Sequence, residues 1–163
     1  MGCGRRLPRL AVGHGCDCPG LTRPKRRAGI GITVYACGED EAALFREMAP
    51  RLGVALTLTD GRWLPRKQML SLAGRPTADF AYARWMGPDR SLVDFSRIQV
   101  DRTRELETWA GVLWELAEQG FDVYGYVNNH FAGHSPSSTR DMQKLLGQRP
   151  VEPEQLGEQM TLF

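Results

Sequence analysis

Polar side chains that are suited to ligand binding and proton transfer follow directly after a strongly apolar segment in the second half of the chain. Asn128, Asn129 and His130 come after Val123 to Val127, and His134 follows four residues later. Histidine titrates near neutral pH, so His130 is the candidate general acid or base, while the two carboxamides are candidates for hydrogen bonds to a polar ligand. Asparagine also tolerates left-handed backbone, so a purely turn-forming role for this pair is the alternative.

Three more candidates follow other apolar runs. Asp60 is a candidate general base, although aspartate before Gly61 is also a common turn former. Arg84 is a fixed cation that suits a carboxylate or phosphate, and its alternative role is an ion pair with Asp60 or Asp79. Trp85 has an aromatic face that can stack on a sugar or base, and its alternative role is packing in the core.

These candidates need a framework that brings strand ends together, and the apolar pattern predicts one. Runs of β-branched and aromatic residues predict strands at Ile32 to Ala36, Val54 to Thr59, Phe80 to Ala83 and Val123 to Val127. Helical spacing predicts a first helix from a cap at Asp40 to Leu52, which Pro50 bends or ends early, and a short second helix around Gln68 to Leu72. A long third helix is predicted at Arg104 to Gln119, with Thr103 as its cap. The last helix is predicted to start with Ser138 and Asp141 and to end at Gly147. This alternation is typical of parallel βα units, in which ligands bind beyond the carboxyl ends of the strands.

Composition and charge favour a single globular domain. The chain has 163 residues, of which 42% are hydrophobic and 25% charged. Its formal net charge of +2 is uneven, because residues 1–27 contain seven Lys or Arg against one Asp, which leaves −4 for the remainder. A mildly acidic body does not favour a nucleic-acid partner. We expect a cytoplasmic protein with no membrane association, since no hydrophobic leader precedes the cysteines and no apolar run approaches the roughly twenty residues that cross a bilayer.

The first 28 residues differ from the rest of the chain. They are rich in Gly, Pro and Arg and show no helical or strand period, so we expect residues 1–28 to be a disordered basic head. The alternative is a zinc site from Cys3, His14, Cys16 and Cys18, but the Cys-x-Cys spacing is not that of a zinc knuckle and no second pair follows.

No motif of a named reaction or cofactor is present. The Gly29-x-Gly31 pair precedes its strand instead of following one, so it does not match a dinucleotide-binding fingerprint. A P-loop, a Gly-x-Ser-x-Gly elbow and a His-Glu-x-x-His helix are all missing. His130 and His134 lie in a loop that contains glycine and proline, not on one helix face, so we predict neither a metal nor a cofactor.

Several separate segments together resemble, in the same order, the C-terminal half of the YecE-like family of uncharacterised proteins. They are TLTDGRW (57–63), TADFAYARWMG (77–87), the Trp109 to Leu113 helix, DVYGYVNNHFAGHSP (122–136) and MTLF (160–163). The resemblance implies a variant of the TIM-type barrel with a pocket at the carboxyl ends of its strands. It places Asp60, Arg84, Gly87, Asn128 and Asn129 at that pocket, with His130 in the less uniform position that follows.

The chain departs from the family at Val127, where an aromatic residue is common, and at Trp85, where a smaller apolar residue is frequent. The N-terminal strands of the family, which supply acidic and aromatic pocket residues, have no counterpart in residues 1–28. We therefore expect a partial, half TIM-type βα barrel of parallel strands at residues 29–163, in a truncated chain with an unrelated head. Its open sheet edges favour self-association, because unpaired strands are templates for pairing.

The resulting functional hypothesis is a polar or anionic small molecule bound at the strand ends. His130 and Asp60 are the candidate catalytic residues, and Arg84, Trp85, Gly87, Asn128 and Asn129 are the candidate ligand-binding residues. Hydrolase or isomerase chemistry in complete relatives is implied by analogy of fold alone. The alternatives are a non-catalytic interaction protein and an inactive remnant.

Overall fold

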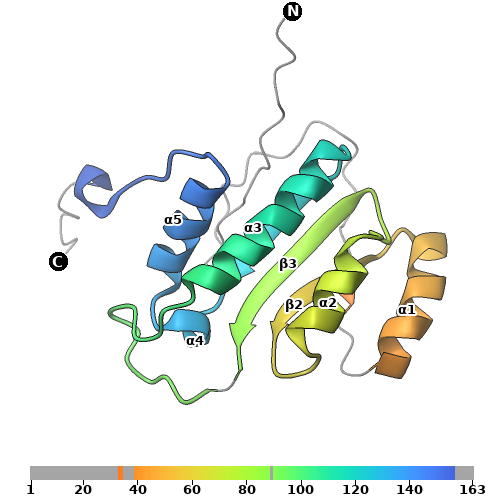
Figure 1. Cartoon of the computed structure of the whole chain (residues 1–163), viewed down its shortest axis with the longest axis horizontal. Coiled ribbons are helices and arrows are strands. Elements are labelled where there is room, and N and C mark those ends of the chain that lie inside the picture. The colour runs from red at the N-terminus through yellow and green to blue at the C-terminus, as the bar shows by residue number, and fades with distance from the viewer. Residues whose placement is uncertain (1–32, 35–38, 89, 157–163) are drawn as a thin grey trace, which may run out of the picture.

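Strands and helices alternate through the part of the chain that the computed structural model describes, residues 33–34, 39–88 and 90–156 (Figure 1). The strands are β1 Thr33–Val34, β2 Ala55–Gly61, β3 Phe80–Gly87 and β4 Asp122–Val127. The helices are α1 Glu39–Leu52, α2 Arg66–Ala73, α3 Thr103–Glu118, α4 Asn129–Ala132 and α5 Ser135–Leu145, followed by the 3-10 helix η1 Pro153–Leu156. The predicted basic head at residues 1–28, with its alternative zinc site, lies outside the described residues.

The strands form one parallel sheet in the order β1-β2-β3-β4, so each strand pairs with its neighbour in sequence. The register places Asp60 opposite Trp85 and Arg84 opposite Tyr126. The α/β class with parallel strands in an open sheet, as in a partial βα barrel, is therefore confirmed. Because parallel strands run in one direction, the segments after β2, β3 and β4 come together at the same end of the sheet.

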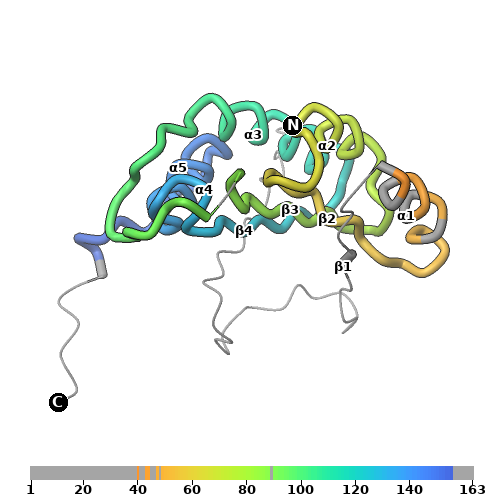
Figure 2. Tube along the Cα trace, turned by 90° about the horizontal axis from the view of Figure 1, so that it is seen from below, coloured from red at the N-terminus to blue at the C-terminus, as the bar shows by residue number. Residues whose placement is uncertain are grey.

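The helices that follow β2, β3 and β4 cover one face of the sheet (Figure 2). Side chains of β3 alternate accordingly, since Ala83 and Trp85 are buried while Tyr82 and Arg84 are half-buried on the opposite face. Trp85 packs edge to face against Trp109 of α3, with 5.9 Å between the ring centroids. The buried set of β3 therefore faces the helices and forms the core with them.

The amphipathic pattern of α3 produces the largest part of that core. Leu106, Trp109, Leu113 and Leu116 recur at helical spacing and are all buried. The predicted capping of this helix by Thr103 is wrong, because Thr103 is its first residue. Its amide and its hydroxyl both donate to a carboxylate oxygen of Asp101.

Other predicted helix ends also differ from the structure. Helix α1 continues through Pro50 to Leu52 instead of ending early, and Asp40 lies inside it, because the helix begins at Glu39. Helix α5 begins at Ser135, with Pro136 in its first turn, so the predicted start at Ser138 is too late. Proline fits the first turn because the amide that it lacks has no partner there.

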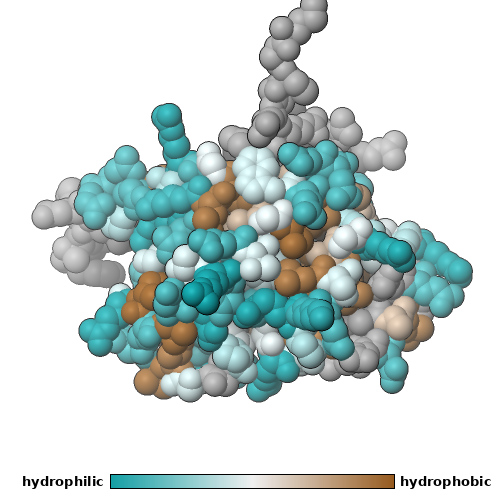
Figure 3. All heavy atoms as spheres, in the orientation of Figure 1, coloured by the Kyte–Doolittle hydropathy of each residue, from teal (hydrophilic) through white to brown (hydrophobic). Residues whose placement is uncertain are grey.

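Apolar side chains are exposed on the long loop between β3 and α3. On the helix-covered side of the molecule, hydrophobic atoms show in the middle of the face and at the lower left, where this loop runs, with hydrophilic atoms around them (Figure 3). Its exposed apolar residues are Val93, Phe95 and Ile98. None of the described helices is long and apolar enough to cross a membrane.

Candidate functional site

A cavity of about 150 Å³ opens at the carboxyl ends of β2, β3 and β4. The segments at the ends of these three strands line it through Arg62, Trp63, Met86, Gly87, Arg90, Asn128 and His130. Three of the predicted site residues, Gly87, Asn128 and His130, are thus brought together. The cavity has the position in which parallel α/β sheets bind ligands.

His130 lies in the one-turn helix α4, directly after the end of β4. Its ring meets the ring of Phe95 edge to face, with centroids 5.0 Å apart and planes at 88°. The Nδ1 atom of His130 is buried and has no hydrogen-bond partner among the described residues. A buried polar atom without a partner is uncommon in proteins, and this one belongs to a residue that lines the cavity.

The two asparagines have different roles. The side-chain oxygen of Asn128 accepts from the amide of His130 at 2.9 Å and so caps α4, which leaves the NH₂ group of this cavity residue for a ligand. The side-chain oxygen of Asn129 accepts from the amide of Ser135 at 2.8 Å, at the start of α5. Asn129 is not among the residues that line the cavity, and its side chain instead joins α4 to the start of α5.

Gly87 brings the end of β3 against α4. Its φ of 81° lies in the left-handed region, and a Cβ atom there would overlap the carbonyl oxygen of His130 and lie 2.7 Å from its carbonyl carbon. Glycine is therefore required twice, for its backbone conformation and for the close approach. The end of β3 and α4 are therefore in direct backbone contact beside the cavity.

Arg62, Trp63, Met86 and Arg90 line the cavity but were not predicted as site residues. The Arg62 guanidinium lies 5.6 Å from the centroid of the Trp63 ring, a cation–π arrangement at the end of β2. The signal was available for two of them, because Arg62 and Trp63 belong to the TLTDGRW segment that carries the family resemblance. Arg90 lies on a loop with no periodic pattern, so nothing in the sequence pointed to it.

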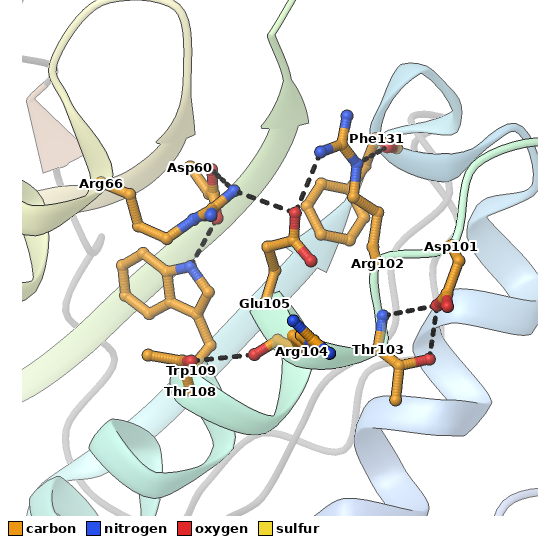
Figure 4. Close-up of polar contacts among 10 residues, drawn as sticks. All are labelled: Asp60, Arg66, Asp101, Arg102, Thr103, Arg104, Glu105, Thr108, Trp109 and Phe131. Atoms are coloured by element: carbon orange, nitrogen blue, oxygen red, sulfur yellow. Dashed lines mark hydrogen bonds and ion pairs between the residues drawn. The ribbon is translucent and has the colours of Figure 1, made fainter.

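Asp60 lies on the helix side of the sheet and does not line the cavity. Its carboxylate accepts from Arg66 Nε at 2.6 Å, from a second Arg66 nitrogen at 3.1 Å and from Trp109 Nε1 at 2.7 Å (Figure 4). The hydrogen bonds to Asp60 raise the pKa of the Arg66 guanidinium above its ordinary value, against the effect of burial. Because this carboxylate accepts three hydrogen bonds from residues of α2 and α3, it is suited to hold β2, α2 and α3 together.

A second carboxylate continues this network toward α4. Glu105 of α3 lies 3.6 Å from Arg66 and accepts from Arg102 at 3.0 Å (Figure 4). Burial raises the pKa of the Glu105 carboxyl, but the hydrogen bond from Arg102 and the nearby cationic charges outweigh it, so that the pKa lies below its ordinary value. Arg102 Nε also donates to the carbonyl of Phe131 at 3.1 Å.

Arg84 and Trp85, the other predicted ligand-binding residues, point to opposite faces of β3 and are not among the residues that line the cavity. Trp85 is fully buried against Trp109, which is the core role that was its alternative. Arg84 is half-buried on the face away from the helices, beside Tyr126 in the register. His134 lies before α5, where its Nδ1 is 2.7 Å from the hydroxyl of Ser137.

No group of three or more His, Cys, Asp or Glu side chains arranged to hold a metal ion occurs in the described ranges. The chemistry of the cavity instead comes from cationic and hydrogen-bonding groups. Two guanidinium groups, a carboxamide and an imidazole surround it, and none of the described residues that line it is acidic. Such a set can hold an anion through charge-assisted hydrogen bonds.

Comparisons with known proteins identify the family but no activity. A family model described as "Protein of unknown function DUF72" matches residues 35–160. The crystal structure of a DUF72 family protein from Thermotoga maritima is similar to this chain, with 19% sequence identity and a TM-score of 0.44. The match covers 68% of this chain and 42% of the Thermotoga protein. No curated protein matches the sequence.

Proposed function

We propose, on the premise that this chain belongs to the DUF72 family of proteins of unknown function, that its strand-end cavity binds a small anionic molecule. The observation that carries the proposal is the charge of the cavity wall. Arg62 and Arg90 line it together with Asn128 and His130, and the described lining contains no carboxylate. A site with several donors and no anionic acceptor favours a carboxylate or phosphate group over a cation.

The size and the remaining walls of the cavity limit the ligand further. A volume of about 150 Å³ suits a molecule of about the size of benzene. Trp63 and Met86 add an aromatic ring and a flexible apolar side chain to the wall. The ligand that fits this combination has an acidic group at one end and a short carbon skeleton, as in a small hydroxy acid.

We also propose that the chain is YecE-like and that this cavity corresponds to the pocket of a TIM-type barrel in complete relatives. Support comes from the quoted motifs, from the parallel sheet with helices on one face, and from the position of the cavity beyond the strand ends. The activity of those relatives, whether hydrolase or isomerase chemistry, belongs to the same proposal.

Catalysis by His130 is the second candidate function. It is favoured by one observation, the position of the His130 side chain in the cavity wall. A bound substrate would lie beside this imidazole, which is the residue type that most often transfers protons in enzymes. The carboxylate of Asp60 accepts from Arg66 and Trp109, so it is not the group that we propose to orient His130.

Calorimetric titration of the full chain with inorganic phosphate at low ionic strength tests the binding proposal. Arg62→Met and Arg90→Met each remove one cation from the cavity wall, and each is expected to weaken phosphate binding by about threefold to tenfold. Both guanidinium groups are on exposed side chains, so added chloride should also weaken binding.

Arg97→Met is the matched control, because Arg97 is an exposed arginine on the same loop as Arg90 and does not line the cavity. It should leave phosphate affinity at the wild-type value. Equal losses in all three variants would mean that phosphate responds to net charge and not to this cavity, and the proposal would be wrong.

A further inference from the structure

The one-turn helix that carries His130 depends on the rest of the molecule for its position. Helix α4 contains only Asn129–Ala132, and isolated helices shorter than about twelve residues are marginal in water. Its last carbonyl groups have no partners within the helix and need them from elsewhere. The place of His130 in the cavity is therefore set by whichever groups bind this turn.

Two backbone contacts and one charged side chain bind it from outside. The carbonyl of Ala132 accepts from the amides of Gln99 and Val100, at 2.7 and 3.2 Å. The carbonyl of Phe131, the residue directly after His130, accepts from Arg102 Nε at 3.1 Å, and the same guanidinium lies 5.8 Å from the centroid of the Phe131 ring. Arg102 is thus the side-chain link between α4 and the start of α3.

The Arg102 side chain is itself held firmly. A second nitrogen of its guanidinium donates to Glu105 at 3.0 Å, and Glu105 lies 3.6 Å from Arg66, which binds Asp60 (Figure 4). The side chains of Arg102 and Glu105 are only 19% and 18% exposed, so water screens this pair weakly. The guanidinium is fixed between a carboxylate and a carbonyl, and it cannot shift without breaking one of the two bonds.

We infer that Arg102 is a positioning residue for His130, and that the network from Asp60 through Arg66 and Glu105 holds Arg102 in place for this task. The inference rests on the proposed function, because the position of His130 matters to a ligand only if the cavity binds one. It gives Asp60 a role at the far end of the network, in place of direct contact with the ligand.

The experiment compares Arg102→Met and Arg102→Lys with the control Arg104→Met, which makes the same change on an exposed residue two positions later, in the first turn of α3. The first readout is the NMR shift of the His130 imidazole at one fixed pH without ligand. Phe95 faces this ring edge to face at 5.0 Å, so its ring current reports small movements. We expect Arg102→Met to shift the imidazole resonances, Arg102→Lys to recover part of the shift, and Arg104→Met to leave them unchanged.

The second readout is the affinity for inorganic phosphate, which we expect to fall by about tenfold in Arg102→Met. Imidazole resonances that stay at their wild-type positions while the melting temperature falls would overturn the inference, because Arg102 would then only stabilise the fold. Shifted resonances in a protein whose wild type binds no phosphate would support the positioning role and contradict the proposed function instead. If Arg102→Met does not fold, Glu105→Gln loosens Arg102 without removing its donors, and it should move the same resonances by less.

Discussion

The side chains near the carboxyl ends of the strands differ in what they already bind. Asp60 accepts three hydrogen bonds from Arg66 and Trp109, so it has little left to offer a ligand. His130 has a buried ring nitrogen with no partner in the described ranges, and Asn128 uses only its oxygen for the cap of α4. The carboxylate of Asp60 is therefore already engaged by donors, whereas the NH₂ group of Asn128 remains for a ligand.

Gly87→Ala is the residue change that tests the close approach of β3 to α4. An alanine there would adopt a left-handed φ of 81° and would overlap the carbonyl of His130. We expect a loss of more than about 2 kcal/mol in the free energy of unfolding, measured by urea denaturation, together with weaker phosphate binding. Gly111→Ala is the control, because a Cβ there meets nothing within 4 Å and alanine favours a helix, so the same assay should show a gain of about 0.5 to 1 kcal/mol. Equal stability of the two variants would contradict this role of Gly87.

The sequence could identify residues whose type and place after a strand are both informative. Gly87, Asn128 and His130 were predicted in this way and line one cavity, and their role in binding stays a prediction. Arg84 and Trp85 were predicted at the end of a strand, but β3 continues to Gly87, so these residues lie within the strand and alternate between its faces. Arg62 was missed although it belongs to the TLTDGRW segment, and Arg90 was missed because exposed arginines on loops are common and only the fold shows that it faces the cavity.

At the scale of elements, the join between α2, α3 and α4 is made by charged side chains in an otherwise apolar layer. Asp60 at the end of β2, Arg66 at the start of α2, and Arg102 and Glu105 at the start of α3 alternate in sign along one chain of contacts (Figure 4). Removing one member of a partly buried ion pair destabilises the fold by more than the intact pair stabilises it, because the remaining charge has no opposite charge beside it. The network therefore makes the strand-end layer sensitive to acid.

Glu105→Gln tests this sensitivity through the pH dependence of stability. The pKa of Glu105 is lowered in the folded protein, so its charged form stabilises the fold fully above its ordinary value of 4.5, and the contribution is lost as the pH falls through the folded pKa. We expect the variant to be about 1 to 2 kcal/mol less stable than the wild type at pH 7, with the difference shrinking below about pH 4.5. Urea denaturation at several pH values measures it, with Glu118→Gln at the exposed end of α3 as the control. A difference that stays constant down to pH 3 would contradict the assignment.

Elements with a strong apolar period could be predicted, and those without one could not. The stripe of α3 and the β-branched and aromatic residues of β4 located both elements to within a few residues. Helix α4 has a single turn, which shows no period, and it is in contact with Gly87, Arg102 and the cap at Asn128, which come from other segments. The prediction that Pro50 bends α1 or ends it early did not allow for its position close to the end of the helix. Few backbone hydrogen bonds of α1 remain to be formed after that position.

At the scale of the whole molecule, the sheet is covered by helices on one face only within the described residues (Figure 2). The other face carries half-buried side chains that include Tyr82, Arg84 and Tyr126, with the two tyrosine rings 5.3 Å apart. Parallel sheets are normally covered on both faces. Self-association through the open sheet edges stays a prediction. The cavity depends on a more local arrangement, the convergence of three strand ends and α4.

The measurement that tests anion binding at the strand ends most directly is a backbone amide NMR titration with inorganic phosphate at constant ionic strength, with chloride as the balancing salt. The proposed site predicts saturable shifts that concentrate at Arg62, Gly87 and His130, around the cavity wall. Shifts that do not saturate, or that gather at exposed arginines away from the cavity such as Arg75 and Arg97, would contradict it.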